Sequence, residues 1–449
     1  MTYKNYLSRL YILMFFGGFL WACQESKPTS ELSKAQAPGT QADTLYMTKA
    51  ILYDKVLGML LGSAIGDAMG APTEMWGRRD ITIQYGYVQD LDTMVREPSP
   101  EGTWAYNLPA GGTTDDTRWK KLVLEYLIAQ KTNKKGHQST LEPRGWAEKI
   151  LNYYEKSIDS LKNTESFQPE PFEIRARQMA WVQEWAMVAK PFLKNDLQEY
   201  NDALSHFYGG EMVCAGLLYS PMIGAYYPTH PTRAYQEAYK LSFFDLGYAR
   251  DISAITAAMV SAAMDTAATP ASVLGLIRTV DPQHYFKSRL VGRASFYIFT
   301  RTQSFIYETK KLRKEQYAAE ELQNLPNPLP VDTLTWLRMQ RVYQFLDKAQ
   351  QDAPFHAAEI YMINLAALLF ADFDYEKTLA FVINYGRDND TAAAVTGAIL
   401  GAYWGAKKLP AESVRRVLEV NKNQLGIDLE KLAQELTDKI ATRYYLVGR

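Results

Sequence analysis

Three short segments of the sequence combine carboxylates with small polar residues, the side chains that hold hard cations or move protons. They are Gly-Asp-Ala-Met-Gly-Ala-Pro-Thr-Glu at 66–74, Gly-Gly-Thr-Thr-Asp-Asp-Thr at 111–117 and Gly-Arg-Asp-Asn-Asp-Thr at 386–391. Taken singly, each could be a helix cap, because Thr, Asp and Asn are favoured there and the helix dipole favours negative charge.

Two of the segments carry more negative charge than a cap requires. Asp115 and Asp116 are adjacent, and Asp388 and Asp390 are two residues apart. Carboxylates held so close repel one another unless a cation neutralises them. Mg²⁺, Mn²⁺ and Ca²⁺ prefer such oxygen ligands, with hydroxyls and water completing the shell. We therefore expect a two-metal site assembled from both clusters.

The elements that must position these segments are helical. Apolar residues recur at helical spacing, as in Leu122, Val123, Tyr126 and Leu127, and alternating strand patterns are missing over any useful length. The stretch from 78 to 109 is the longest without clear periodicity, which is typical of a functional or disordered segment. The pattern predicts an all-α body.

Two of the predicted helices carry glycine at every fourth position. The first stripe is Gly58, Gly62, Gly66 and Gly70, and the second is Gly397, Gly401 and Gly405. Glycine costs about 1 kcal/mol relative to alanine inside a helix, so each stripe requires compensation, which close approach of another backbone provides. We infer that the two helices pack in one core, which makes residues 50–449 a single domain.

The N-terminus resembles a bacterial lipoprotein signal peptide. Lys4 and Arg9 precede an apolar stretch at 10–20, and Leu-Trp-Ala-Cys ends at Cys23 as a lipobox would. We expect residues 1–23 to be the signal peptide, lipid-anchored through Cys23, and 24–49 to be a flexible tether. This places the protein in the cell envelope on the extracytoplasmic side. The alternative is an uncleaved anchor helix.

The composition excludes several other classes of function. With 49 basic and 50 acidic residues among 449, the net charge of −1 gives no basic excess for nucleic-acid binding. Five His and two Cys are too few for a zinc framework. Once Cys23 is lipid-modified, Cys214 has no partner, and its apolar neighbours indicate a buried structural thiol.

The three acidic segments together resemble the ADP-ribosylglycohydrolase family. The family pattern runs G-D-x-x-G-x-P-x-E, G-x-x-T-D-D-T and G-x-D-x-D-T followed by a small-residue helix, and all three occur here in order. The resemblance covers residues 50–406. It implies an all-α orthogonal multi-helix bundle with two Mg²⁺ or Mn²⁺ ions at its centre, in an enzyme that hydrolyses the glycosidic bond of an ADP-ribosylated protein or a small ribosyl substrate.

The resemblance also implies roles for individual residues. It implies metal binding by two facing sets, which are Thr114, Asp115 and Asp116 on one side and Asp388, Asp390 and Thr391 on the other. Glu74, Asp115 and Asp388 are the candidate catalytic carboxylates, and Asp67 would support the site from behind. A carboxylate would take a proton from water while the C1–N or C1–O bond opens through an oxocarbenium-like state.

Two departures from the family pattern affect the expected substrate contacts. Arg387 stands where many relatives have glycine, and it could bind a substrate anion or pair with a nearby carboxylate. The stretch at 244–251 lacks the Thr-His pair that many relatives carry there. Arg250 and Asp251 could replace it, or they could form an exposed ion pair at a helix start. Four aromatic residues near the motifs, interpreted as core, are Trp76, Tyr85, Trp119 and Tyr385.

Four other functions compete with this interpretation. A haloacid-dehalogenase-type phosphatase would need a strand before Asp388 and a Thr two places after Asp390, whereas Thr391 follows immediately. A calcium-binding module would need EF-hand spacing, which is missing. Hydrolysis of another ribosyl or nucleoside-like substrate, and a family member that binds its ligand without hydrolysing it, both stay open, since ligands alone do not establish catalysis.

Overall fold

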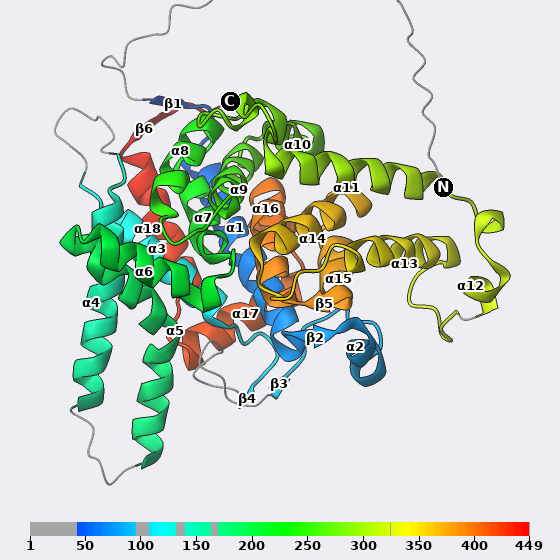
Figure 1. Ribbon diagram of the computed structural model, residues 1–449, viewed down its shortest axis with the longest axis horizontal. Helices are drawn as coiled ribbons and strands as arrows, with labels where there is room; N and C mark the ends of the chain where they lie inside the picture. The colour runs from blue at the N-terminus through cyan, green and yellow to red at the C-terminus, as the bar shows by residue number, and fades with distance from the viewer. Residues whose placement is uncertain (1–42, 96–106, 132–139, 163–168, 324, 449) are drawn as a thin grey trace, which may run out of the picture. The chain divides into compact units, whose positions relative to one another are not determined.

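The computed structural model describes residues 43–95, 107–131, 140–162, 169–323 and 325–448 (Figure 1). The predicted signal peptide with Cys23 lies outside these ranges, as does most of the predicted tether. Of the tether range, residues 43–49 are described, and Asp43–Leu45 form strand β1. Residues 42–449 make up one compact unit.

The prediction of an all-α fold is confirmed, because eighteen α-helices account for most of the described chain. They are α1 (Lys49–Gly70), α2 (Arg78–Tyr85), α3 (Asp115–Ala129), α4 (Pro143–Lys162), α5 (Pro169–Lys194), α6 (Leu197–His206), α7 (Ala215–Tyr226), α8 (Pro231–Leu241), α9 (Ala249–Ala263), α10 (Pro270–Thr279), α11 (Ala294–Lys311), α12 (Ala319–Gln323), α13 (Thr333–Asp347), α14 (Ala357–Phe370), α15 (Tyr375–Tyr385), α16 (Asn389–Trp404), α17 (Ala411–Gln424) and α18 (Leu429–Ala441).

Three pairs of very short strands fasten loops to one another. The pairs are β1 with β6 (Tyr444–Leu446), β2 (Trp76–Gly77) with β5 (Gly386–Arg387), and β3 (Met94–Val95) with β4 (Asn107–Leu108). The first pair is parallel and the other two are antiparallel. None of these strands is longer than three residues, so they connect helices without forming a layer of their own.

Helices α1 and α16 lie against each other at the centre, drawn blue and orange in Figure 1. A methyl group added at Gly62 would overlap the carbonyl oxygen of Gly397, and one added at Gly58 would overlap that of Gly401. The pairing runs antiparallel, since Gly70 at the end of α1 meets the backbone of Asp390 at the start of α16. The two glycine stripes therefore bring the two helix backbones together, as the sequence predicts.

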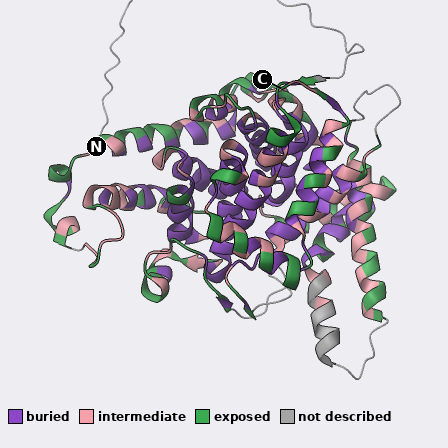
Figure 2. Ribbon diagram, turned by 180° about the vertical axis from the view of Figure 1, so that it is seen from behind, coloured by how far each residue is buried: buried purple, intermediate pink, exposed green. Residues whose placement is uncertain are grey.

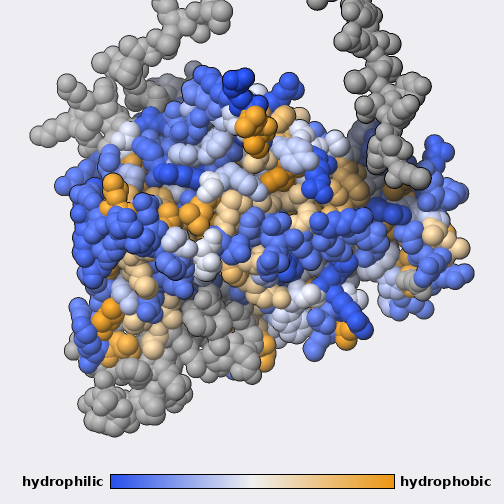
Figure 3. Space-filling view, viewed as in Figure 1, coloured by the Kyte–Doolittle hydropathy of each residue, from blue (hydrophilic) through white to orange (hydrophobic). Residues whose placement is uncertain are grey.

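The remaining helices surround this pair. Figure 2 shows buried residues concentrated in the inner helices and exposed residues on the outer ones. In Figure 3 the visible face is largely hydrophilic, with apolar side chains interspersed. No helix in the described ranges has both the length and the apolarity needed to cross a membrane. The range 78–109, in which the sequence shows no clear periodicity, is partly helical, because it contains α2.

Candidate functional site

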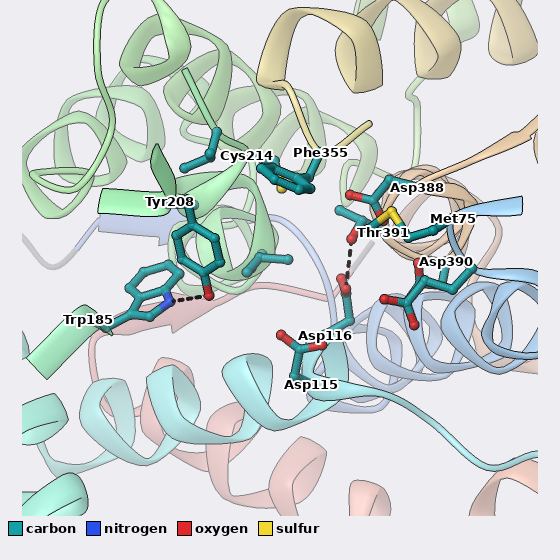
Figure 4. Close-up of a pocket in the computed structure, with 14 residues that line it drawn as sticks. Met75, Asp115, Asp116, Trp185, Tyr208, Cys214, Phe355, Asp388, Asp390 and Thr391 are labelled. Carbon is teal, nitrogen blue, oxygen red and sulfur yellow. Dashed lines mark hydrogen bonds between the residues drawn. The ribbon is translucent and has the colours of Figure 1, made fainter. Parts of the chain in front are cut away.

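A cavity of about 520 Å³ lies where the three acidic segments meet, and its two walls differ in chemistry (Figure 4). We call the first the acidic wall and the second the apolar wall. The acidic wall consists of Glu74, Asp115, Asp116, Asp388, Asp390 and Thr391. The apolar wall consists of Trp185, Tyr208, Val213, Cys214, Leu218 and Phe355. A cavity with polar groups on one side of an apolar lining is the usual form of a small-molecule site.

The antiparallel pairing of α1 and α16 brings the first and third segments together. Residues 71–73 continue α1 as a 3-10 turn, and Glu74 follows it at the rim of the cavity. The next backbone amide, of Met75, donates to the carbonyl of Arg387 over 2.8 Å, and the β2–β5 pairing begins one residue later. Both Met75 and Arg387 have positive φ. The β2–β5 pairing holds Met75 and Arg387 in these strained conformations. It thereby keeps Glu74, directly before Met75, close to Asp388, directly after Arg387.

Asp67 holds the second segment against α1 from below the cavity. Its carboxylate accepts the backbone N–H groups of Thr114 and Thr117 over 2.9 and 3.0 Å, and it also accepts the Thr117 hydroxyl. It is fully buried and is not part of the cavity lining. Asp67 thus caps α3 from another helix, and its predicted supporting role in the site stays a prediction.

The starts of α3 and α16 face each other and exchange hydrogen bonds. The Thr114 hydroxyl donates to Asp390 Oδ2 over 3.1 Å, and the Thr391 hydroxyl donates to Asp116 Oδ2 over 2.9 Å, the bond dashed in Figure 4. At the start of each helix, a threonine hydroxyl thus donates a hydrogen bond to an aspartate at the start of the other helix. Both N-termini direct the positive ends of their dipoles toward the carboxylates, which stabilises negative charge there.

The acidic wall contains donor atoms suited to a hard cation. Asp390 is buried, yet its Oδ1 atom has no hydrogen-bond partner. A buried carboxylate oxygen without a partner is costly, and a divalent cation would satisfy it. Within the described ranges, no three Asp, Glu, His or Cys side chains already converge as a ready-made ion site. The acidic wall therefore provides carboxylate oxygens, and threonine hydroxyls lie between them.

Burial raises the pKa of most of these carboxyl groups. The pKa of Asp388 rises to about 7 and that of Asp67 to about 6, in both cases chiefly through burial and then through the charge of Asp116. The pKa values of Asp115 and Asp390 also lie well above the ordinary range, mainly because of burial. For Asp115, the Arg118 guanidinium opposes the rise. Such shifts show that burial disfavours the charged form of these carboxyl groups, and that neighbouring carboxylates add to the effect.

The open question about Arg387 is answered by its contacts. Its guanidinium forms an ion pair with Glu359, with Nε and Oε1 2.7 Å apart, and it also donates to the carbonyl of Gln351. Glu359 is buried and accepts from both Nε and Nη2 of Arg387. Arg387 is therefore committed to a carboxylate and does not line the cavity.

The prediction of an exposed ion pair between Arg250 and Asp251 is wrong. Asp251 is fully buried, and it accepts two hydrogen bonds from Arg293 and one from the Ser295 hydroxyl. Arg250 donates to the carbonyl of Tyr239 instead. The partner of Asp251 lies more than forty residues away on the chain, beyond the reach of local spacing. Neither residue lines the cavity.

Among the aromatic side chains, the core interpretation holds for two of four residues, and the cavity residues were missed. Trp119 and Tyr385 are buried in the core, as expected, whereas Trp76 and Tyr85 are only half-buried and pack against each other. Trp119 packs against Trp185, with ring centroids 4.0 Å apart. Trp185 and Tyr208 lie far from every motif, and no sequence signal marks Trp185. A weak signal exists for Tyr208, because the two glycines after it predict the turn that gives it a φ of 46°.

Comparisons with known proteins agree with this architecture. Residues 48–445 match the family model for ADP-ribosylglycohydrolase. The ADP-ribosyl-[dinitrogen reductase] glycohydrolase of Rhodospirillum rubrum is 34% identical over 86 residues, which are 19% of this chain and 26% of that protein. A solved structure described as an ADP-ribosylglycohydrolase-related protein complex has a TM-score of 0.50 at 16% identity. The match covers 87% of this chain and 99% of that one, and at this identity it concerns the fold alone.

Proposed function

Because the chain belongs to the ADP-ribosylglycohydrolase family, we propose that it hydrolyses the glycosidic bond of an ADP-ribosyl substrate at the acidic wall of its cavity. The observation that carries the proposal is the convergence of five carboxylates from three separate segments on one cavity. Three of them come from positions 74, 115 and 116, and two from 388 and 390. A structural role would not require so many carboxylates around an open space.

The reaction would depend on divalent cations, Mg²⁺ or Mn²⁺, of which resemblance to the family implies two. Thr114, Asp115 and Asp116 would supply ligands from one side, and Asp388, Asp390 and Thr391 from the other. When bound, the cation supplies Lewis acidity beside the ribose. The unpartnered, buried Oδ1 of Asp390 supports this assignment, and so does the burial that raises the pKa of Asp388, because a bound cation would compensate both carboxylates for lost hydration.

Glu74 would move the proton. It lies at the rim of the cavity and is only half-buried, so water reaches it. As general base it would take a proton from the attacking water, whose oxygen forms the new bond to C1 of the ribose. The C1–N or C1–O bond breaks, its electron pair leaves with the departing group, and that group is then protonated. Asp115 and Asp388 would stabilise the positive charge that develops on the ribose ring.

The test is hydrolysis by the purified protein with Mg²⁺ or Mn²⁺, measured on ADP-ribosyl-arginine and ADP-ribosyl-serine. Asp388→Asn and Glu74→Gln should each lower kcat by at least 100-fold, because each removes a charge that acts at the reacting bond. Asp196→Asn is the matched control, since Asp196 caps α6 at the surface and Asn caps equally well. Turnover that is unchanged in both cavity variants would contradict the proposal.

A second candidate is a smaller ribosyl or nucleoside-like substrate, which the apolar wall favours. Trp185, Tyr208 and Phe355 offer ring surfaces opposite the carboxylates, and such surfaces suit a planar or apolar leaving group. Nucleosides in the same assay distinguish this candidate from the first. Binding of ADP-ribose without release of any product would instead indicate a ligand-binding member of the family.

We further propose that the protein acts at the cell envelope, held there by a lipid on Cys23. The sequence before residue 24 supports this, as it has the n-region, apolar stretch and lipobox of a lipoprotein signal peptide.

A further inference from the structure

We propose that the ammonium group of Lys120 takes the place of one cation at the acidic wall, so that the centre binds a single divalent ion, beside Asp388 and Asp390. The inference rests on the proposed function, because it concerns the same wall and the same kind of ion. It departs from the two ions that resemblance to the family implies.

Lys120 lies one helical turn after Asp116 on α3 and is bound to it twice. Its Nζ atom donates to Asp116 Oδ1 over 2.9 Å and to the Asp116 carbonyl over 3.0 Å. Both side chains are 2% exposed. A buried ammonium needs a fixed anionic partner, and here that partner is one of the carboxylates that the family pattern assigns to metal. The positive charge is therefore part of the site.

The bonds of Asp116 and Asp390 make the two sides of the wall unequal. Both carboxylate oxygens of Asp116 are engaged, Oδ1 by Lys120 and Oδ2 by the Thr391 hydroxyl. Asp390 keeps one oxygen, Oδ1, without a partner although the residue is 1% exposed and lines the cavity. An ion beside Asp390 finds an open ligand. An ion at Asp116 must displace a hydrogen bond and approach a fixed positive charge at close range.

Counting Mn²⁺ ions bound to the metal-free full-length protein tests the inference, by isothermal titration calorimetry and by elemental analysis after gel filtration. We expect one ion per native chain. Lys120→Met keeps the length of the side chain and removes its charge, and we expect it to bind two ions. Lys120→Arg retains the charge and should still bind one. Lys121→Met is the matched control, since the neighbouring Lys121 pairs with Glu125 at the surface.

The native stoichiometry decides the question even if Lys120→Met fails to fold. Two ions of similar affinity on the native chain would overturn the role of Lys120 and leave the metal-dependent hydrolase intact. A native chain that binds no ion would overturn both proposals. One ion on the native chain and a second site at least ten-fold tighter in Lys120→Met than in Lys121→Met would support the inference.

Discussion

At the residue scale, the acidic wall depends on a carboxylate that the substrate never reaches. Asp67 ties the start of α3 to α1 through three hydrogen bonds, two of them from backbone amides. Its burial is tolerable because every bond it accepts compensates for lost hydration. The same bonds determine where Thr114 and Asp116 lie. Asp67 is therefore a positioning residue for ligands on a neighbouring segment.

Replacing Asp67 with Asn tests this role. The amide nitrogen of Asn donates hydrogen bonds, so at least one donor of the 114–117 segment would lose its acceptor. We expect a loss of about 1–3 kcal/mol in the free energy of unfolding, measured by urea titration. We also expect weaker Mn²⁺ binding, although Asp67 does not line the cavity. If stability falls while Mn²⁺ affinity stays unchanged, Asp67 supports the fold but does not position the ligands.

At the element scale, the two glycine-striped helices determine where the motifs meet. Their register places Gly70 on the backbone of Asp390, so the last turn of α1 and the first turn of α16 share one end of the pair. Side chains at Gly62 or Gly397 would separate the backbones and move the acidic segments apart. Close packing of α1 and α16 is thus a condition for the site.

Gly62→Ala and Gly275→Ala should have opposite effects on stability. Alanine favours helix by about 1 kcal/mol at either position. At Gly62 the new methyl overlaps the Gly397 carbonyl, and overpacking of this kind costs about 1–3 kcal/mol or more. At Gly275, inside α10, nothing lies within 4 Å of the added atom. Thermal unfolding should therefore show a lower Tm for Gly62→Ala and an equal or higher one for Gly275→Ala. A raised Tm in both would mean that the helices can separate at no cost.

The sequence allowed the helical class, the meeting of the glycine stripes and the grouping of the acidic segments to be predicted, because each rests on a local pattern with a physical meaning. It did not allow the partners of Arg387 and Asp251 to be predicted, since Glu359 and Arg293 are distant in the chain. Trp185 was missed for a similar reason, because only the packing brings it to the cavity. Lys120 was missed although it lies four residues after Asp116 in a predicted helix, a spacing that favours an ion pair.

At the scale of the whole folded body, the buried carboxyl groups make stability depend on pH. The pKa values of Asp67 and Asp388 rise to about 6 and about 7, against about 3.9 for Asp in an unfolded chain. Those of Asp115 and Asp390 are raised as well. At pH values between the unfolded and the folded pKa, these carboxyl groups keep their protons in the folded chain but have lost them in the unfolded chain. The stabilisation is complete below about pH 4 and disappears as pH rises through the folded values.

We therefore expect the metal-free protein to be more stable at pH 5 than at pH 7.5, as measured by urea unfolding in the presence of a chelator. His356 acts in the opposite direction, because burial lowers its pKa, but it is one group against five, since burial also raises the pKa of Asp245 to about 6. Asp388→Asn should reduce the pH dependence. Adding Mn²⁺ at pH 7.5 should restore stability, since the ion neutralises the same carboxylates. Equal stability at both pH values, without metal, would contradict this account.

The antiparallel contact between α1 and α16 also determines when the site can form during synthesis of the chain. Asp67 leaves the ribosome 323 residues before Asp390. At 5–20 residues per second, that interval is roughly 20–60 s. Until translation passes the third acidic segment, α1 has no α16 to cover its glycine face. Ion binding at the site thus becomes possible only after the third acidic segment has been synthesised.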